Sequence, residues 1–337
     1  MPSKWLSTSY YVLRFVVLMA LLMLSCFGYY LLTPLNTGGA WPRSITIETG
    51  ASMTIIAQQL AQQGLIEQPK LFIWSARLLG YANTLRAGSY ELQQALSPLA
   101  LLQYLSRGNM RLAAITFIEG WQWRQIRQAI NNHPDLRHDS QQWDDMRLMA
   151  WLGSPDLSPE GMFFPDTYYF AKGSSDLWVL KRAYQLMQQR LAQAWAMRQQ
   201  AQSPLQTPYE LLILASIVEK ETAVEADRPL VAAVLTNRLR KGMRLQADPT
   251  VIYGMGERYQ GNLRRIDLQT DTPYNTYTRV GLTPTPIAMP GNAALFATIN
   301  PASSKALYFV AKGDGSSYFS ERLHEHNRAV RRYQLGD

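Results

Sequence analysis

The chain of 337 residues is long enough for roughly two domains of ordinary size. Its 47% of hydrophobic residues can build a sizeable core, and its formal charge of +8 is scattered without a long basic run. That scatter, and the lack of zinc-ligand spacing, argue against nucleic-acid binding. A basic surface of this kind suits a membrane surface or an acidic polymer instead.

The N-terminal segment predicts a membrane anchor. Phe15 to Leu32 carries no charge and would span about 27 Å as a helix, close to the thickness of a bilayer core. Lys4 and Arg14 precede this run and the next charge is Arg43, so the positive-inside rule places the N-terminus in the cytoplasm. We therefore expect a cytoplasmic tail and single-pass anchor at residues 1–33, a linker at 34–44, and export of the remainder.

Two alternatives to an uncleaved anchor stay open. A cleavage site near Gly38-Gly39-Ala40 would make the run a signal sequence. Leu22 to Cys26 loosely matches a lipid-attachment sequence, although the apolar run continues past the cysteine. Cys26 is the only cysteine, so the chain forms no intrachain disulfide in any compartment.

The next segment, residues 45–110, predicts a small module. Strand and helix signals alternate as strand 45–47, helix 52–63, helix 69–79 and strand 88–92, and another helix begins at Ser97-Pro98 and ends at Gly108. This β-α-α-β order resembles a LysM-like module, which is a glycan-binding fold.

Residues 111–206 predict a mixture of strands, helices and turns. We expect a strand from Leu112 to Ile118, a helix around Trp123, and a helix from Leu177 to Ala201. The stretch from Asn132 to Ser158 is polar and rich in turn residues. Its two histidines lack regular ligand spacing, so we assign no metal to them.

The segment Pro159 to Tyr168 has an unusual composition, with two carboxylates, two prolines and three aromatic residues. Aromatic rings that stack on sugars and carboxylates that bind hydroxyls suit a sugar-binding cleft, which makes Glu160 and Asp166 candidates. The alternative is a rigid loop whose aromatic side chains fill the core.

The segment from Thr207 to Thr222 predicts a helix with acidic residues at its end. Thr207 is the expected N-cap, Pro208 suits the first turn, and Glu210 completes a capping box. Glu221 extends an apolar stripe at helical spacing, whereas Glu219 lies on another face that is also fairly apolar, so periodicity favours Glu221 only slightly. A carboxylate on a core-facing helix has a raised pKa and can act as a general acid near neutrality. The alternative is a solvated, charged helix end.

The remainder of the chain predicts further elements. A second helix opens at Asp227 and ends at Gly242, and Asp248-Pro249 is able to cap a turn or a helix. The proline-rich segment from Gly281 to Gly291 predicts a shaped loop. A hairpin is expected over 307–319 and a closing helix over 321–333.

Four motifs carry a resemblance to a known family. They are Ile217-Val218-Glu219-Lys220-Glu221-Thr222-Ala223-Val224, Asn237-Arg238-Leu239, the run from Leu245 to Gly254, and Tyr274-Asn275-Thr276-Tyr277. In this order they closely resemble the YceG-like family, the bacterial endolytic murein transglycosylases, over nearly the whole chain.

The resemblance implies an α+β fold with an N-terminal transmembrane helix, a small LysM-like βααβ module, and a lysozyme-like mixed α/β catalytic region. That region would occupy 111–337, with its core motifs in 207–290. The implied partners are peptidoglycan glycan strands, the inner membrane, and cell-wall synthases (penicillin-binding proteins). The implied place of action is the periplasm, and the implied role is terminating or trimming nascent strands.

The resemblance also selects site residues. The order of a Glu-Thr pair, a Gly-x-Met-Gln-type element and a Tyr-Asn pair is similar to that of other lytic transglycosylases. It implies Glu221 as the catalytic acid and Gln246, Tyr274 and Asn275 as substrate-binding groups. Glu160, Asp166 and Asp248 are weaker substrate-binding candidates, and no metal or cofactor is implied.

The chemistry implied for this family breaks the MurNAc–GlcNAc β-1,4 bond without water and leaves a 1,6-anhydro ring. Because the nucleophile is the substrate's own C6 hydroxyl, one well-placed acid is sufficient. Two rival functions stay open. One is a hydrolytic muramidase with Asp248 or Asp166 as its second carboxylate, and the other is a non-catalytic anchored glycan-binding module that positions cell-wall synthases.

Overall fold

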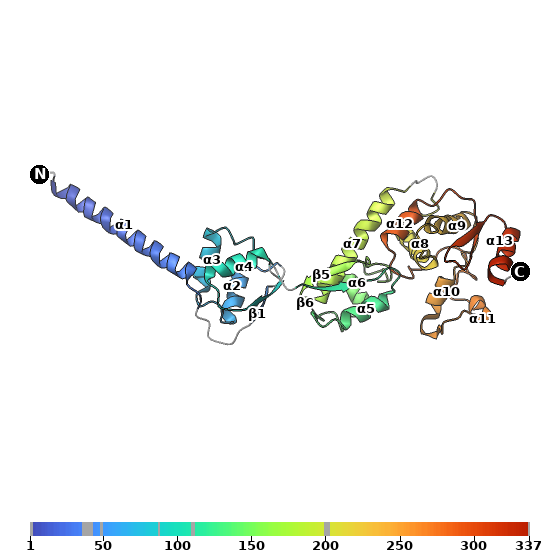
Figure 1. The fold of residues 1–337 in the computed structure, drawn as a ribbon, viewed down its shortest axis with the longest axis horizontal. Coiled ribbons are helices and arrows are strands. Elements are labelled where there is room, and N and C mark those ends of the chain that lie inside the picture. Colours follow the sequence, from blue (N-terminus) through green and yellow to red (C-terminus); the bar gives the residue numbers. More distant parts are fainter. Residues whose placement is uncertain are drawn as a thin grey trace. The chain divides into compact units, whose positions relative to one another are not determined.

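A computed structural model describes residues 3–35, 43–47, 50–86, 88–108, 112–198 and 203–335 (Figure 1). The fold is mixed α+β and mainly helical. Within these residues every β-sheet has two strands. The chain divides into two compact units. The first comprises residues 1–113 with 169–174, and the second comprises 114–168 with 175–337.

The first unit begins with a long apolar helix, α1 (Ser3–Leu32). Its Leu13–Leu32 segment is long and apolar enough to cross a membrane, as an anchor or as a signal sequence. The side chains described between Leu13 and Leu24 are exposed, as expected for a helix that packs on no protein core. Most of the predicted linker, residues 36–42, lies outside the described residues, and so does the alternative cleavage site at Gly38-Gly39-Ala40.

The rest of the first unit is built from β1 (Arg43–Ile47), α2 (Met53–Gln62), α3 (Pro69–Leu78), β2 (Gly88–Leu92) and α4 (Pro98–Arg107). The predicted β-α-α-β order is confirmed, and β1 pairs antiparallel with β2, with Ile45 opposite Tyr90. Ser52 and Ser97 cap their helices as expected. The resemblance to a LysM module stays a prediction.

A single apolar core holds this module together. It buries side chains from both strands and all three helices, among them Ile45, Leu60, Phe72 and Leu102. Leu35, just after α1, packs against the same core.

Seven elements lie in the chain between the module and α8. They are β3 (Leu112–Thr116), α5 (Trp123–Asn131), β4 (Leu136–Arg137), α6 (Asp145–Trp151), β5 (Thr167–Ala171), β6 (Ser174–Ser175) and α7 (Asp176–Ala196). β3 pairs with β5, and β4 pairs with β6. The stretch expected to be turn-rich contains α6, which begins where the Asp144 side chain caps the Arg147 N–H.

The aromatic residues of the Pro159–Tyr168 segment fill the core. Phe163, Phe164 and Tyr168 are all buried, and Phe163 stacks on Trp123 with ring centroids 4.8 Å apart. The interpretation of these rings as sugar-stacking surfaces is therefore wrong, and the alternative of a rigid, core-filling loop is right.

The second unit continues with α8 (Pro208–Glu221), α9 (Arg228–Arg240), α10 (Asp248–Met255), the short η2 (Gly256–Arg258), α11 (Arg265–Gln269) and α12 (Asn292–Ile299). The predicted hairpin is confirmed as β7 (Tyr308–Ala311) with β8 (Ser317–Ser320). The closing helix is α13 (Leu323–Val330), which continues as a π-helical turn, η3 (Arg331–Leu335). α8 is central, because α7, α9, α10 and α12 all pack against it.

Candidate functional site

The helix that carries the acidic residues is buried along most of its length. The Thr207 side chain accepts the Glu210 N–H at 3.2 Å, which confirms the predicted cap. The Glu210 carboxylate accepts the Gln206 N–H, so the expected reciprocal bond to Thr207 is absent from the contacts of these residues. Every residue from Leu211 to Val218 is buried, so both faces of α8 meet protein and periodicity does not separate Glu219 from Glu221.

Glu221 is the last residue of α8 and is half-buried. Burial, and after it the negative charge of Asp248, raise the pKa of its carboxyl to about 8, while the Arg238 guanidinium opposes both effects. The C-terminal end of a helix also disfavours a negative charge. Among the described residues, none forms a hydrogen bond to the Glu221 carboxyl. The raised pKa and the lack of a hydrogen-bond partner among the described residues make Glu221 the candidate for a general acid.

Glu219 has a different set of contacts. Its carboxylate accepts the Gly291 N–H at 2.9 Å, which ties α8 to the end of the proline-rich loop. Burial raises its pKa, the Gly291 hydrogen bond lowers it, and nearby Glu119 raises it. A Cβ at position 291 would lie only 1.8 Å from a Glu119 carboxylate oxygen, so a larger residue there would require the Glu119 side chain to move. Glu219 is thus occupied in holding the loop.

Glu160 is buried and also occupied. Its carboxylate accepts the Trp123 N–H at 3.0 Å and the Tyr253 hydroxyl at 3.1 Å. Burial raises its pKa to about 7, and these hydrogen bonds partly offset that rise. Through them Glu160 joins the start of α5 to the middle of α10.

The Gln246 loop is organised by Arg238, which the sequence motifs do not single out as a site residue. Arg238 is buried on α9, and its guanidinium donates to the carbonyls of Arg244, Leu245 and Leu307 and to the Gln246 side-chain oxygen at 2.9 Å. Gln246 has φ of +52°, a left-handed conformation that is costly for a residue with a side chain. Backbone strain is therefore held in a loop bound by Arg238, whose guanidinium also acts electrostatically on the half-buried Glu221.

Asp248 follows this loop as the first residue of α10 and is exposed. The Tyr277 hydroxyl donates to its carboxylate at 2.5 Å, and Asp248 is a main cause of the raised Tyr277 pKa, after burial. Tyr277 is a second residue outside the predicted set, although it lies within the Tyr274–Tyr277 motif. Glu221, Arg238, Asp248 and Tyr277 thus influence one another electrostatically.

Tyr274 and Asn275 begin that motif but have different surroundings. Tyr274 is half-buried, its ring lies 4.8 Å from that of Tyr253, and its hydroxyl is 3.0 Å from the Thr285 hydroxyl. Asn275 is fully buried and donates to three carbonyls, those of Asp267, Leu268 and Thr270. Its own side-chain oxygen accepts the Tyr277 N–H. Asn275 therefore shapes the turn that presents Tyr274 and Tyr277.

Asp166 stands apart from this cluster. It is exposed, and its carboxylate accepts the N–H of its neighbour Thr167 at 2.7 Å. Among the described contacts, none joins its side chain to the other candidate residues.

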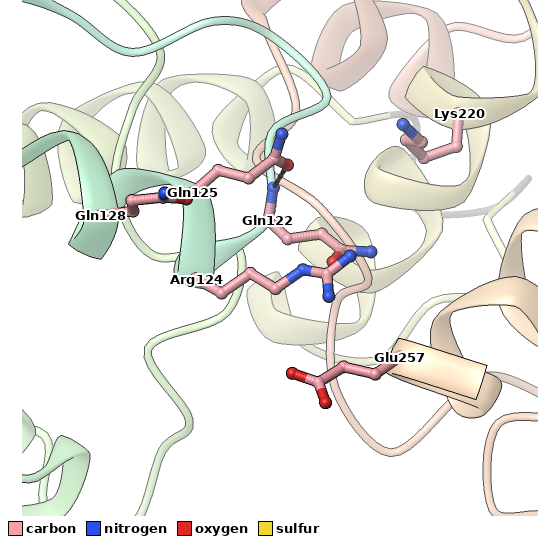
Figure 2. A pocket seen from close by; sticks show the side chains of 6 residues that line it. All are labelled: Gln122, Arg124, Gln125, Gln128, Lys220 and Glu257. Carbon is pink, nitrogen blue, oxygen red and sulfur yellow. Dashed lines mark hydrogen bonds between the residues drawn. The ribbon is translucent and has the colours of Figure 1, made fainter. Parts of the chain in front are cut away.

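A polar cavity of about 520 Å³ lies beside the acidic end of α8. Figure 2 shows its lining, with Arg124 reaching from α5 into the space that also receives the Glu257 carboxylate from η2. Its other lining residues are Gln122, Gln125, Gln128 and Lys220. Lys220 directly precedes Glu221, and its ammonium donates to the Gly120 carbonyl at 3.3 Å. The cavity therefore offers amide, cationic and carboxylate groups beside Lys220, and Glu221 itself is not among its lining residues.

Comparisons with known proteins agree on one family. The sequence model of the YceG-like family matches residues 45–332. The chain is 32% identical over 326 residues to the endolytic murein transglycosylase of Bacillus subtilis, covering 91% of this chain and 89% of that protein. It is 30% identical over 363 residues to the endolytic murein transglycosylase of Streptococcus pneumoniae, covering 95% of this chain and 64% of that protein.

A solved structure is similar as well. It is the crystal structure of the yceG-like protein lmo1499 from Listeria monocytogenes, with a TM-score of 0.56 and 28% sequence identity. The match covers 86% of this chain and 99% of that one.

Proposed function

The chain belongs to the YceG-like family, and from that premise we propose that it cuts peptidoglycan glycan strands internally, with Glu221 as the proton donor. Its relatives are named endolytic murein transglycosylases, which are lyases of the lytic transglycosylase class, and the chain is an enzyme of this class. The cleaved bond is the MurNAc–GlcNAc β-1,4 linkage, and the products carry 1,6-anhydro-MurNAc ends.

One observation supports Glu221 as the general acid. Three carboxyls in the second unit, those of Glu160, Glu219 and Glu221, have raised pKa values because they are buried. The first two accept hydrogen bonds from the protein, whereas the Glu221 carboxyl has no such partner among the described residues. A general acid must reach the leaving oxygen of its substrate, so the unoccupied acid is the best candidate.

The proposed reaction needs no water. Glu221 transfers its proton to the glycosidic oxygen as the bond from that oxygen to C1 of the muramyl residue breaks. The C6 hydroxyl oxygen of the same residue bonds to C1, and its proton passes to the Glu221 carboxylate. The acid is thereby restored at the end of each cycle, and intramolecular attack avoids the entropy loss of capturing a separate nucleophile.

The groups around Glu221 have supporting parts in this proposal. Gln246 and Tyr274 bind and orient the substrate, and Asn275 positions the turn that carries Tyr274 rather than touching the glycan. Asp248 keeps Glu221 protonated and faces the positive charge that develops on the sugar ring. The polar cavity at Lys220 binds a part of the strand beyond the cleaved bond.

Hydrolysis is the second candidate, and the effect of Asp248 on Glu221 favours it over a purely glycan-binding role. A carboxylate close to a general acid is the arrangement with which glycosidases activate water. Asp248 accepts the Tyr277 hydroxyl, which leaves it further acceptor capacity for a water molecule. Only the products distinguish this reaction from ring closure.

We further propose that α1 is an uncleaved inner-membrane anchor and that all following residues lie in the periplasm. In this arrangement the βααβ module is LysM-like and binds glycan, and the catalytic region is lysozyme-like. The enzyme would act on strands as cell-wall synthases make them, and it would terminate or trim these strands near the membrane.

The test compares the full chain with Glu221→Gln and with Glu225→Gln, a matched change at an exposed carboxylate on the connection that follows α8. Purified sacculi are digested in detergent and the released ends are identified. Glu221→Gln should release no anhydro ends, and Glu225→Gln should behave like the unaltered protein. Equal release by both variants would refute the role of Glu221.

A further inference from the structure

The outer face of α3 combines apolar and basic side chains. Lys70, Trp74, Arg77 and Leu78 follow one another at helical spacing, and all four are exposed. Trp74 is 69% exposed and Leu78 is 72% exposed, whereas Phe72 and Ala76 on the opposite face are completely buried in the module core. An indole and a leucine flanked by two cations form the pattern of a helix face that lies on a membrane.

The module follows closely on the end of the apolar helix α1. α1 ends at Leu32, and only three residues later the Leu35 N–H donates to the Leu96 carbonyl at 3.1 Å. Three residues span at most about 10 Å. α1 also contacts α4, and α4 contacts α3. The module is therefore fastened directly to the end of the apolar helix.

We propose that the outer face of α3 binds the surface of the same bilayer that α1 crosses. Trp74 and Leu78 enter the boundary between headgroups and acyl chains, and Lys70 and Arg77 bind lipid phosphates. The proposal rests on α1 being a membrane anchor. Its consequence is that the module has a fixed orientation on the membrane instead of swinging on a tether.

A glycan is the other ligand that an exposed indole suits, because its face can stack on a sugar ring. The flanking cations and the neighbouring leucine favour the bilayer, since a neutral sugar chain gains little from either. The two ligands have different consequences for a probe at position 78, and the test uses this difference.

The full chain is reconstituted into vesicles of phosphatidylethanolamine and phosphatidylglycerol. Because Cys26 is the only cysteine, Cys26→Ser with Leu78→Cys takes a single environment-sensitive fluorophore at an exposed site. A matched protein carries the label at Gln58→Cys, an exposed polar position on α2. Resistance of both proteins to an alkaline carbonate wash establishes that α1 is embedded.

We expect the label at position 78 to show blue-shifted emission and at least twofold stronger quenching by spin-labelled lipid than the label at 58. Replacing both Lys70 and Arg77 by Glu should reduce that quenching. Equal, water-like emission at both positions in wash-resistant protein would overturn the proposal. A response at 78 to soluble glycan strands in place of lipid would overturn it in favour of a glycan site. If the wash removes both proteins, α1 is not embedded in the bilayer and the proposal fails. That result does not test the role of Glu221 in catalysis.

Discussion

Glu221→Gln should make the protein more stable while abolishing cleavage. The pKa of Glu221 is about 8 in the folded chain against an ordinary value of 4.5. Between these values the unfolded chain releases the proton and the folded chain keeps it, so stability falls by about 1.4 kcal/mol for each pH unit. At pH 7.5 the loss approaches ~4 kcal/mol, and solvent at the half-buried carboxyl reduces it to about 1–3 kcal/mol.

The sign of this effect is definite. The pKa of Glu221 is higher in the folded chain than in the unfolded chain. The stability contributed by the protonated Glu221 carboxyl is therefore fully present below pH 4.5 and is lost as the pH rises through about 8. Glutamine cannot ionise and avoids the loss. The gain from the substitution should therefore be negligible at pH 4.5 and largest above pH 8.

Thermal unfolding of the full chain in detergent measures this gain. A unit of this size gains roughly 2–4 °C in its midpoint for each kcal/mol. We expect Glu221→Gln to unfold several degrees above the unaltered protein at pH 7.5 and at the same temperature at pH 4.5, with Glu225→Gln unchanged throughout. A variant that is less stable at pH 7.5, or equally stabilised at both pH values, would refute the raised pKa of Glu221.

Three further results are expected. The cleavage rate should fall as the pH rises through about 8, because Glu221 must be protonated, and Asp248→Asn should move this decline to lower pH; a pH profile unchanged by that substitution would contradict the coupling. Arg238→Met should lower the unfolding midpoint by several degrees and remove most activity, since the loop before α10 loses its donors; an active, equally stable variant would exclude this positioning role. Gly161→Ala should destabilise the chain more than Gly153→Ala, because both have positive φ but only a Cβ at 161 would lie 2.4 Å from a proline ring. Equal unfolding midpoints for these two variants would show that the clash is relieved.

The helix ends were predictable because they depend on a few neighbouring residues. Ser52, Ser97 and Thr207 cap their helices, and Gly108 takes the left-handed conformation after α4. α12 gives no such signal, because its N-cap is Gly291, without a side-chain hydrogen bond. Its short apolar run becomes a helix through packing against α7, α8 and α9.

Periodicity alone only weakly predicted Glu221 as the proposed acid. The apolar stripe that ends at Glu221 does not separate it from Glu219, because every residue from Leu211 to Val218 is buried and both faces of α8 meet protein. The choice between Glu219 and Glu221 then depends on tertiary contacts, in which Gly291 occupies one carboxylate and leaves the other unbonded within the described chain. Such contacts join residues some seventy positions apart, and no local pattern reports them.

The sequence pattern of α9 indicates that Arg238 is buried. It extends the face formed by Val231, Val234 and Leu235 on α9, so a cation falls at a core-facing position. A buried guanidinium needs acceptors, which here are carbonyls of the Gln246 loop. The spacing thus indicates burial, but its partners become evident only in the folded chain.

The reaction itself is tested most directly by the chemistry of the new ends. Sacculi are digested with the full chain in heavy-oxygen water, and the released muropeptides are analysed by mass spectrometry. If Glu221 acts alone and the C6 hydroxyl is the nucleophile, every new muramyl end is a 1,6-anhydro ring that carries no heavy oxygen. Reducing ends that are one water heavier and contain the isotope would contradict this mechanism and establish hydrolysis.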